Sequence, residues 1–126
     1  MRTVLQVAGM LLVLSALLGC QQMERNMDEF VENAEYTTPD LQEIPDGTYT
    51  GKQRVGIVNV KLRVTITDGR IEAIDLLKHF NGQGEDAEAI IDDVIAAQSV
   101  EVDTISGATY SSTAILKAIE NALTLE

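Results

Sequence analysis

Six of the ten residues in the stretch DTISGATYSS, Asp103 to Ser112, carry a hydroxyl group: Thr104, Ser106, Thr109, Tyr110, Ser111 and Ser112. Hydroxyl side chains before a helix commonly cap it, because their oxygen accepts hydrogen bonds from the free N–H groups of the first turn. A segment with helical apolar spacing follows directly, so we expect Ser111 or Ser112 to cap a helix. Six hydroxyls exceed the needs of a cap, and the stretch is therefore a candidate site for chemistry on a hydroxyl oxygen.

The stretch does not have the partners that a self-contained hydrolase or transferase needs. A Ser or Thr nucleophile requires a base within hydrogen-bond reach, and His79 is the only His of the chain. No Ser-x-x-Lys occurs, because Ala114 and Ile115 stand three residues after Ser111 and Ser112. Neither the Gly-x-Ser-x-Gly elbow nor the Gly-x-x-x-x-Gly-Lys phosphate loop is present. The sequence therefore disfavours hydrolysis or transfer by this chain alone.

The N-terminus has the features of a bacterial lipoprotein signal. Arg2 precedes an apolar run from Val7 to Leu18, which is shorter than the roughly 20 residues of a membrane-spanning helix but typical of a secretory signal. Leu17-Leu18-Gly19-Cys20 resembles a lipobox, in which the Cys receives a diacylglyceryl group and becomes the new N-terminus. We expect residues 1–19 to be removed and Cys20 to be lipidated. An ordinary secretory signal with an incidental Cys is the alternative.

The chain is strongly acidic, with 9 basic and 20 acidic residues and a formal net charge of −11. Removal of residues 1–19 takes away Arg2 and no acid. Such a charge repels nucleic acid and anionic lipid, so we expect no nucleic-acid partner and membrane association through the lipid anchor. Since Cys20 and His79 are the only Cys and His, we expect no disulfide and no metal site built from these ligands.

The mature chain divides by composition. Gln21 to Gln42 holds six acids, one base and few large apolar residues, which predicts a flexible acidic tether. A short helix around residues 27–34 is left open. We therefore divide the chain into a signal peptide at 1–19, a lipidated Cys and tether at 20–42, and one folded domain at 43–126.

The folded part reads as strands followed by helices. Apolar residues alternate with polar ones from Val58 to Ile66, Asp68-Gly69 supplies a hairpin turn, and Ile71 to Phe80 forms the partner strand. Further expected elements are a strand at Gly47 to Gln53, a turn or bulge at Gly56, a loop at Asn81 to Glu85, and helices around Ala87 to Ile95 and Ala114 to Leu123. This order predicts an α+β fold, a small antiparallel sheet with two helices packed on it.

The hydroxyl-rich stretch carries a family resemblance. Asp103-Thr104-Ile105-Ser106-Gly107-Ala108-Thr109 is similar to the flavinylation motif Asp-x-x-Ser/Thr-Gly-Ala-Thr of the FMN-binding domain family, which includes the C and G subunits of sodium-pumping and Rnf-type redox complexes. Its flanks extend the resemblance over most of the domain: Asp46 to Gly51, Val58 to Ile74, Gln98-Ser99, Ser111-Ser112 and the last helix. The short, lipid-anchored, single-domain members are the most similar.

The resemblance implies that FMN is joined through its phosphate to the hydroxyl of Thr109 by a separate flavin transferase, which draws FMN from FAD. Small neighbours leave the Thr109 hydroxyl accessible, and Gly107 is able to take a positive φ in a sharp loop. The following helix N-terminus, expected at roughly Tyr110 to Ser112, offers N–H groups and a positive dipole end to the phosphodiester. The candidate cofactor-binding residues are Asp103, Ser106, Gly107, Ala108, Thr109, Tyr110, Ser111, Ser112 and His79.

Three of these residues keep alternative interpretations. Asp103 serves recognition by the transferase, either directly or by holding the loop. Tyr110 either stacks on the isoalloxazine or packs against the sheet. His79 resembles a family His near the flavin, and a surface His without a role in binding is the alternative.

The function that follows is an extracytoplasmic electron-transfer lipoprotein with covalent FMN, which exchanges electrons between a membrane-linked donor and an acceptor outside. It acts as a carrier more than as an enzyme, because the cofactor performs the redox chemistry. The alternative is a lipid-anchored binding module that uses the same fold without flavin. The expected location is the cell membrane, on its extracellular or periplasmic side.

Overall fold

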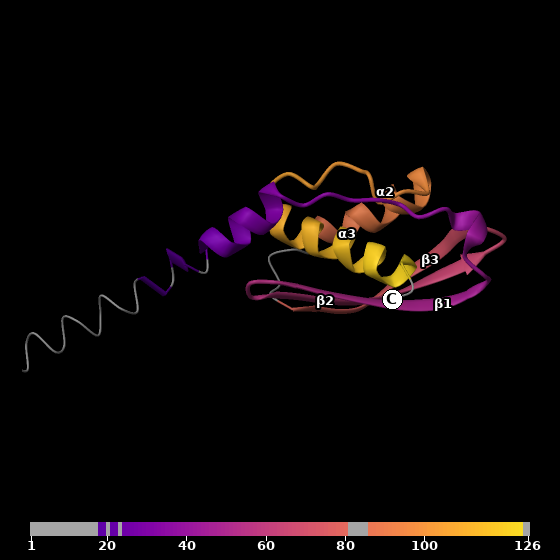
Figure 1. Ribbon diagram of the computed structural model, residues 1–126, viewed down its shortest axis with the longest axis horizontal. Helices are drawn as coiled ribbons and strands as arrows, with labels where there is room; N and C mark the ends of the chain where they lie inside the picture. Colours follow the sequence, from indigo (N-terminus) through magenta and orange to yellow (C-terminus); the bar gives the residue numbers. More distant parts are fainter. Residues whose placement is uncertain (1–17, 20, 23, 81–85, 125–126) are drawn as a thin grey trace, which may run out of the picture.

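A computed structural model describes residues 18–19, 21–22, 24–80 and 86–124. After a helix over residues 24–32, the elements in chain order are η1 (Leu41–Glu43), β1 (Gly47–Val55), β2 (Val58–Thr67), β3 (Arg70–Phe80), η2 (Asp86–Ala89), α2 (Ile90–Ala97) and α3 (Thr109–Leu123) (Figure 1). Cys20, most of the predicted signal peptide and the predicted loop at Asn81 to Glu85 lie outside the described residues.

The three strands form one antiparallel sheet in the order β1-β2-β3. Alternate residues of β2 are buried, as the period-2 pattern predicts. Asp68 and Gly69 both have positive φ, at 51° and 70°, which is the backbone that a two-residue hairpin turn requires. Gly56, at φ 58°, forms the turn between β1 and β2. The predicted strands and turns are therefore confirmed, with β1 two residues longer than expected.

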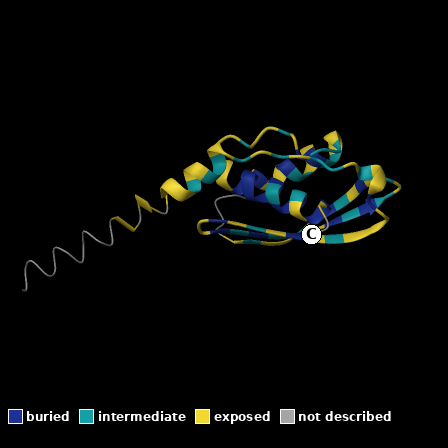
Figure 2. Ribbon diagram, in the orientation of Figure 1, coloured by how far each residue is buried: buried dark blue, intermediate teal, exposed yellow. Residues whose placement is uncertain are grey.

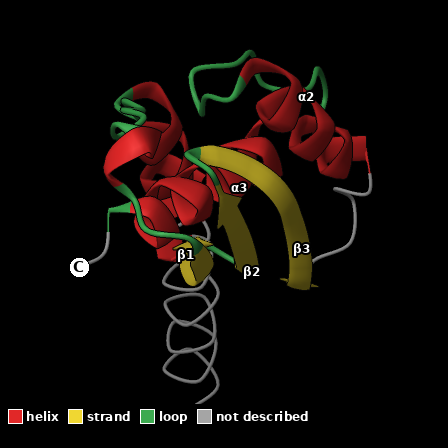
Figure 3. Cartoon of the chain, turned by 90° about the vertical axis from the view of Figure 1, so that its right-hand side faces the viewer, coloured by secondary structure: helices red, strands yellow, loops and turns green. Residues whose placement is uncertain are grey.

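The helices cover one face of the sheet only (Figures 1 and 3). α3 packs on β1 and β2, while α2 packs on β3. The buried apolar residues lie between these layers (Figure 2), and the largest fully buried ones are Leu62, Ile66, Ile71, Ile90, Ile115, Leu116, Ile119 and Leu123. The α+β fold with helices packed on an antiparallel sheet is confirmed.

Gly51 allows α3 to approach the sheet closely. A Cβ at this position would overlap the carbonyl group of Ala118 and would lie 2.9 Å from the Cβ of Ala122. Any side chain on Gly51 would therefore push α3 away from β1. Gly51 therefore sets the distance between β1 and α3, the helix that begins at Thr109.

The segment before the sheet is packed on the domain, which differs from the flexible coil expected for Gln21 to Gln42. Met27, Phe30 and Tyr36 contact the core. The Thr37 N–H donates to the Glu120 carboxylate at 2.7 Å, and further bonds join Lys117 to the Glu35 carbonyl and Thr38 to Ser99 and Val100. The composition of the segment did not predict these contacts, because only a few apolar residues make them and the segment as a whole is acidic.

None of the helices in the described ranges combines the length and the apolarity that crossing a bilayer requires.

Candidate functional site

Thr109 is the first residue of α3, and its side chain is exposed. The Ser112 N–H donates to the Ala108 carbonyl at 2.9 Å, the first bond of the helix. The N–H groups of the three preceding residues therefore have no acceptor within the helix. The first turn of α3 contains no acidic residue, so the positive end of the helix dipole is not offset from within the helix. This end of α3 suits an anionic group near the Thr109 hydroxyl.

The loop before Thr109 is held in a fixed shape. The Ala108 N–H donates to the Ile105 carbonyl at 3.0 Å, and the Ile105 N–H donates to the Ser112 hydroxyl at 3.1 Å. Gly107 at the tip has φ 80°, with no heavy atom within 4 Å of where a Cβ would be. The expected positive φ of Gly107 is thus confirmed, and the reason for glycine here is backbone conformation and not lack of space.

The prediction that Ser111 or Ser112 caps the helix was wrong. The N-cap residue is Ala108, and it makes no side-chain capping bond. Since α3 begins at Thr109, both serines lie within its first turns, and both are buried. Ser112 braces the loop through the Ile105 N–H, and Ser111 faces His79.

His79 is a buried bridge and not a surface residue. It is the penultimate residue of β3, and its side chain is 5% exposed. Its Nε2 lies 3.1 Å from the Ser111 hydroxyl, and its Nδ1 lies 3.4 Å from the Glu88 carboxylate. The imidazole therefore ties the end of β3 to the first turn of α3 and to η2.

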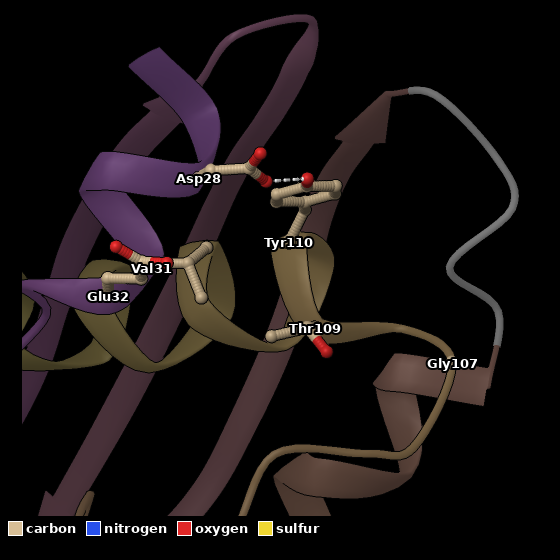
Figure 4. A pocket seen from close by; sticks show the side chains of 6 residues that line it. All are labelled: Asp28, Val31, Glu32, Gly107, Thr109 and Tyr110. Carbon is tan, nitrogen blue, oxygen red and sulfur yellow. Dashed lines mark hydrogen bonds between the residues drawn. The ribbon is translucent and has the colours of Figure 1, made fainter. Parts of the chain in front are cut away.

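Tyr110 points toward the N-terminal helix. Its hydroxyl donates a hydrogen bond to Asp28, and the ring is partly exposed and not packed against the sheet (Figure 4). The hydrogen bond to Asp28, then burial, and then the negative charges of Asp28 and Glu24 raise the pKa of Tyr110 above its ordinary value of 10.0. In Figure 4 the hydroxyl of Thr109 points away from Asp28.

A hollow of about 390 Å³ lies between the N-terminal helix and the motif; it is lined by Asp28, Val31, Glu32, Gly107, Thr109 and Tyr110. Sequence analysis placed the last three in the site and missed the first three. The spacing of Met27, Phe30, Val31 and Ala34 at i, i+3, i+4 and i+7 is the signal that could have found this wall. The two walls of the hollow, residues 28–32 and residues 107–110, are about 80 residues apart in the chain.

The remaining motif residues occupy the loop. Asp103, Thr104 and Ser106 are exposed, and Ala108 is buried. Of the predicted residues, the structure thus brings Gly107, Thr109 and Tyr110 to the hollow, and it places His79, Ser111 and Ser112 beneath them as supports. Within the described ranges, no cluster of three or more His, Cys, Asp or Glu residues is arranged to hold a metal ion.

Comparison with known proteins identifies the family. The model of the FMN-binding domain matches residues 56–124, which is more than half of the chain and includes β2, β3, α2, the motif loop and α3. The chain belongs to the FMN-binding domain family. It is also 36% identical, over 84 residues and 64% of its length, to an uncharacterized protein of Treponema pallidum (strain Nichols). The alignment covers about a quarter, 23%, of that protein.

The residues at this end of the domain fit FMN. The family match covers the exposed Thr109 hydroxyl, the free N–H groups of α3 and one wall of the hollow. An anionic phosphate is favoured at the helix N-terminus, and the adjoining hollow offers Tyr110 and Val31 to a flat ring system.

Proposed function

We propose that this protein is an extracytoplasmic electron-transfer lipoprotein, with FMN attached covalently through its phosphate to the Thr109 hydroxyl and with Cys20 as its lipid anchor. The observation that supports this most is the position of Thr109, an exposed hydroxyl at the first residue of a helix and beside a hollow. The lipobox-like sequence supports the anchor.

The attachment reaction uses FAD and a separate flavin transferase. The Thr109 oxygen attacks the phosphorus of the FMN half, the pyrophosphate P–O bond breaks, AMP leaves, and the hydroxyl proton is released. The product is a phosphodiester between threonine and riboflavin, and no electrons are transferred. Since the attacking oxygen is exposed and points away from Asp28, the transferase is able to reach it without displacing the N-terminal helix.

The chain then positions the cofactor. The N–H groups of the first turn of α3 would hold the phosphodiester, and the positive φ of Gly107 sets the shape of the loop before Thr109. Tyr110 would be the residue that contacts a ring system bound in the hollow, where the Asp28 and Glu32 carboxylates place negative charge. That charge disfavours the addition of electrons, so these carboxylates lower the reduction potential.

Bound FMN supplies the electron-accepting and electron-donating chemistry. The protein itself contributes the tether, the orientation and the local charge. A covalent bond suits a carrier outside the cytoplasm, where a cofactor that dissociated would be lost. The donor is a membrane redox protein and the acceptor an extracytoplasmic one.

The decisive experiment is intact-protein mass spectrometry after export in a cell that contains a flavin transferase. The unchanged protein is expected to weigh one FMN minus one water more than its lipidated polypeptide, and Thr109→Ala is expected to lack that increment completely. Thr104→Ala is the matched control and is expected to keep the increment, because it removes an exposed hydroxyl from the same loop at a position that the motif leaves variable. Full flavin on Thr109→Ala would refute the assignment, and absence of flavin from the unchanged protein would favour the binding-module alternative.

A further inference from the structure

The basic residues of this acidic protein gather on the face of the sheet that the helices leave bare. Strand register places Lys52 and Arg54 of β1, Lys61 and Arg63 of β2, and Arg70 and Lys78 of β3 on this face, which we call the open face. They are six of the nine Lys and Arg residues in the chain. Figure 1 shows both α2 and α3 on the opposite side of the sheet.

The arrangement places like charges in direct register. Lys52 lies opposite Lys61, and Lys61 lies opposite Lys78, so three lysines form a row across all three strands. Like charges at opposed positions destabilise a sheet. Two acids on or beside the face are Asp75, opposite Arg63, and Glu72, which accepts a bond from Thr67. Among the described residues, none of the six open-face bases lies within 4.0 Å of a carboxylate oxygen.

Protection of a sheet edge does not explain this pattern. Lysines on edge strands hinder unwanted strand pairing, which suits Lys52 and Lys78. Edge protection does not explain Lys61 and Arg63, because they lie on the central strand, β2, which is paired on both sides. The row therefore points to an external negative surface.

One end of the open face also carries exposed apolar side chains. Phe80 is 65% exposed and Ile57 is 55% exposed, and with Arg54, Asn59 and Lys78 they surround a shallow hollow of about 390 Å³. Large apolar groups beside basic ones are the pattern of proteins that bind the surface of anionic membranes.

The N-terminal segment reaches the same end of the molecule. The Met27 side chain lies over Gly56, in the turn next to Ile57. The chain continues from there toward Cys20, seven residues earlier in the sequence. A lipid on Cys20 would therefore hold the Ile57 and Phe80 end close to a bilayer.

We propose that the open face docks on the surface of an anionic phospholipid bilayer, with Phe80 and Ile57 in the headgroup region. Anionic lipid headgroups are complementary in charge to the open face. A bilayer also accommodates a broad sheet face without requiring a complementary shape. In this pose the helical layer, with Thr109 at the start of α3, faces away from the membrane. The net charge of −11 does not prevent docking, because screening over about 8–10 Å makes the nearest charges dominate.

The inference uses the lipid anchor of the proposed function but not its flavin. The test uses the mature lipidated chain, reconstituted into vesicles of phosphatidylcholine alone or of phosphatidylcholine with phosphatidylglycerol. Accessible amines are acetylated and quantified by peptide mass spectrometry. Acetylation of Lys52, Lys61 and Lys78 is expected to fall about threefold or more on the anionic vesicles only, and to recover in about 1 M salt, where the screening length is about 3 Å.

Lys117 is the internal control, because it lies on α3 beside Glu120 and away from the open face. Its acetylation is expected to be the same on both vesicles. Equal labelling of the open-face lysines on both vesicles would overturn the proposal and leave the face to a protein partner. Protection on both vesicles that grows with protein density would overturn it in favour of a second copy of this chain.

Charge-reversal variants separate docking by this face from general attraction. K61E/R63E is expected to abolish the protection of Lys52 and Lys78, and Phe80→Ser to weaken it. Arg25→Glu removes a base from the N-terminal helix and is expected to leave protection unchanged; an equal loss in Arg25→Glu would overturn docking by the open face. If K61E/R63E does not fold, the comparison of the two vesicles with the unchanged protein still decides.

Failure of the anchor is recognised separately by flotation. A chain that floats with neutral vesicles is anchored, whatever its lysines show. A chain that floats only with anionic vesicles has no working anchor but supports docking, and a chain that floats with neither overturns both.

Discussion

Three hydroxyl residues that are close in the sequence have different surroundings because of where α3 begins. A helix turns by about 100° per residue, so Thr109, Ser111 and Ser112 point in different directions from the first turn. Thr109 is exposed, Ser111 lies against His79, and Ser112 accepts the Ile105 N–H. The only one of the three that offers an accessible oxygen is the residue at which the family motif ends, which is why the proposed attachment falls on Thr109.

Asp28 controls the ionisation of Tyr110. The Tyr110 pKa is raised chiefly because its hydroxyl donates to Asp28, so Asp28→Ala is expected to bring the pKa back toward 10.0. Ultraviolet titration of the tyrosines measures this, with Tyr110→Phe identifying the contribution of Tyr110. Glu29→Ala is the matched control, since it removes an adjacent exposed carboxylate that is not bonded to Tyr110. An unchanged titration in Asp28→Ala would show that the bond does not persist in solution.

The sign of the associated pH effect follows from the direction of this shift. Because the folded state holds the Tyr110 proton more tightly than the unfolded state, the contribution of the contact to stability is complete below the ordinary tyrosine pKa. It is lost as the pH rises through the raised, folded-state pKa. The N-terminal helix is therefore expected to loosen from α3 in strongly alkaline solution and not near neutral pH.

At the scale of the elements, the contact between β1 and α3 depends on Gly51. Gly51→Ala is expected to destabilise the domain by about 1–3 kcal/mol, because the new Cβ would overlap the Ala118 carbonyl group and force α3 outward. In a domain of this size, that corresponds to a fall in melting temperature of roughly 10 °C, measured by circular dichroism.

Thr50→Ala is the control for Gly51→Ala, because Thr50 is the exposed neighbour on the same strand. Its melting temperature is expected to stay near that of the unchanged protein. Equal melting of Gly51→Ala and Thr50→Ala would mean that α3 tolerates displacement, and the close packing would then not explain the glycine.

The elements that the sequence predicted well are those whose signal is local. The alternation along β2, the Asp68-Gly69 turn and the apolar spacing of α3 each follow from neighbouring residues, and each is confirmed. The start of α3 was placed too late, because the residue before it is an alanine without a capping side chain. The hydroxyls of Ser111 and Ser112 suggested a cap, but tertiary contacts with β3 and the loop use them instead.

The candidate site was predicted only on one side. The motif named Gly107, Thr109 and Tyr110, while the opposite wall, Asp28 with Glu32, comes from a segment whose composition indicated a tether. Composition averages over residues, and the few that pack, such as Phe30, are a minority of the segment. The pairing of Asp28 with Tyr110 is long-range, and nothing in either local sequence specifies it.

At the scale of the whole molecule, net charge and charge distribution lead to different expectations about partners. The value of −11 led to the expectation of repulsion from anionic lipid. Strand register nevertheless places six bases on one face, since residues two apart on a strand point the same way. Charge distribution and not total charge therefore decides what each side of the molecule attracts.

A shortened chain tests whether the N-terminal segment stabilises the whole domain. A chain that begins at Glu43, exported by another signal, loses the core contacts of Met27, Phe30 and Tyr36 and the bond from Thr37 to Glu120. We expect it to fold, because the sheet and both helices are intact. It is expected to be less stable by about 2–4 kcal/mol, since partly buried side chains contribute about 1 kcal/mol each and a hydrogen bond a similar amount.

The melting temperature of the shortened chain is thus expected to fall by about 10 °C or more. Thr109 in the folded fraction is expected to acquire flavin, because the motif loop and α3 are complete. Phe30→Ala in the full chain is the graded control, and its melting temperature is expected to lie between those of the shortened and the unchanged chains. Unchanged melting of the shortened chain would show that the segment acts only as a tether, as its composition predicts. Folding without flavin attachment would instead show that the wall formed by Asp28 and Glu32 is required by the transferase, and that the domain boundary at residue 43 cuts through the site.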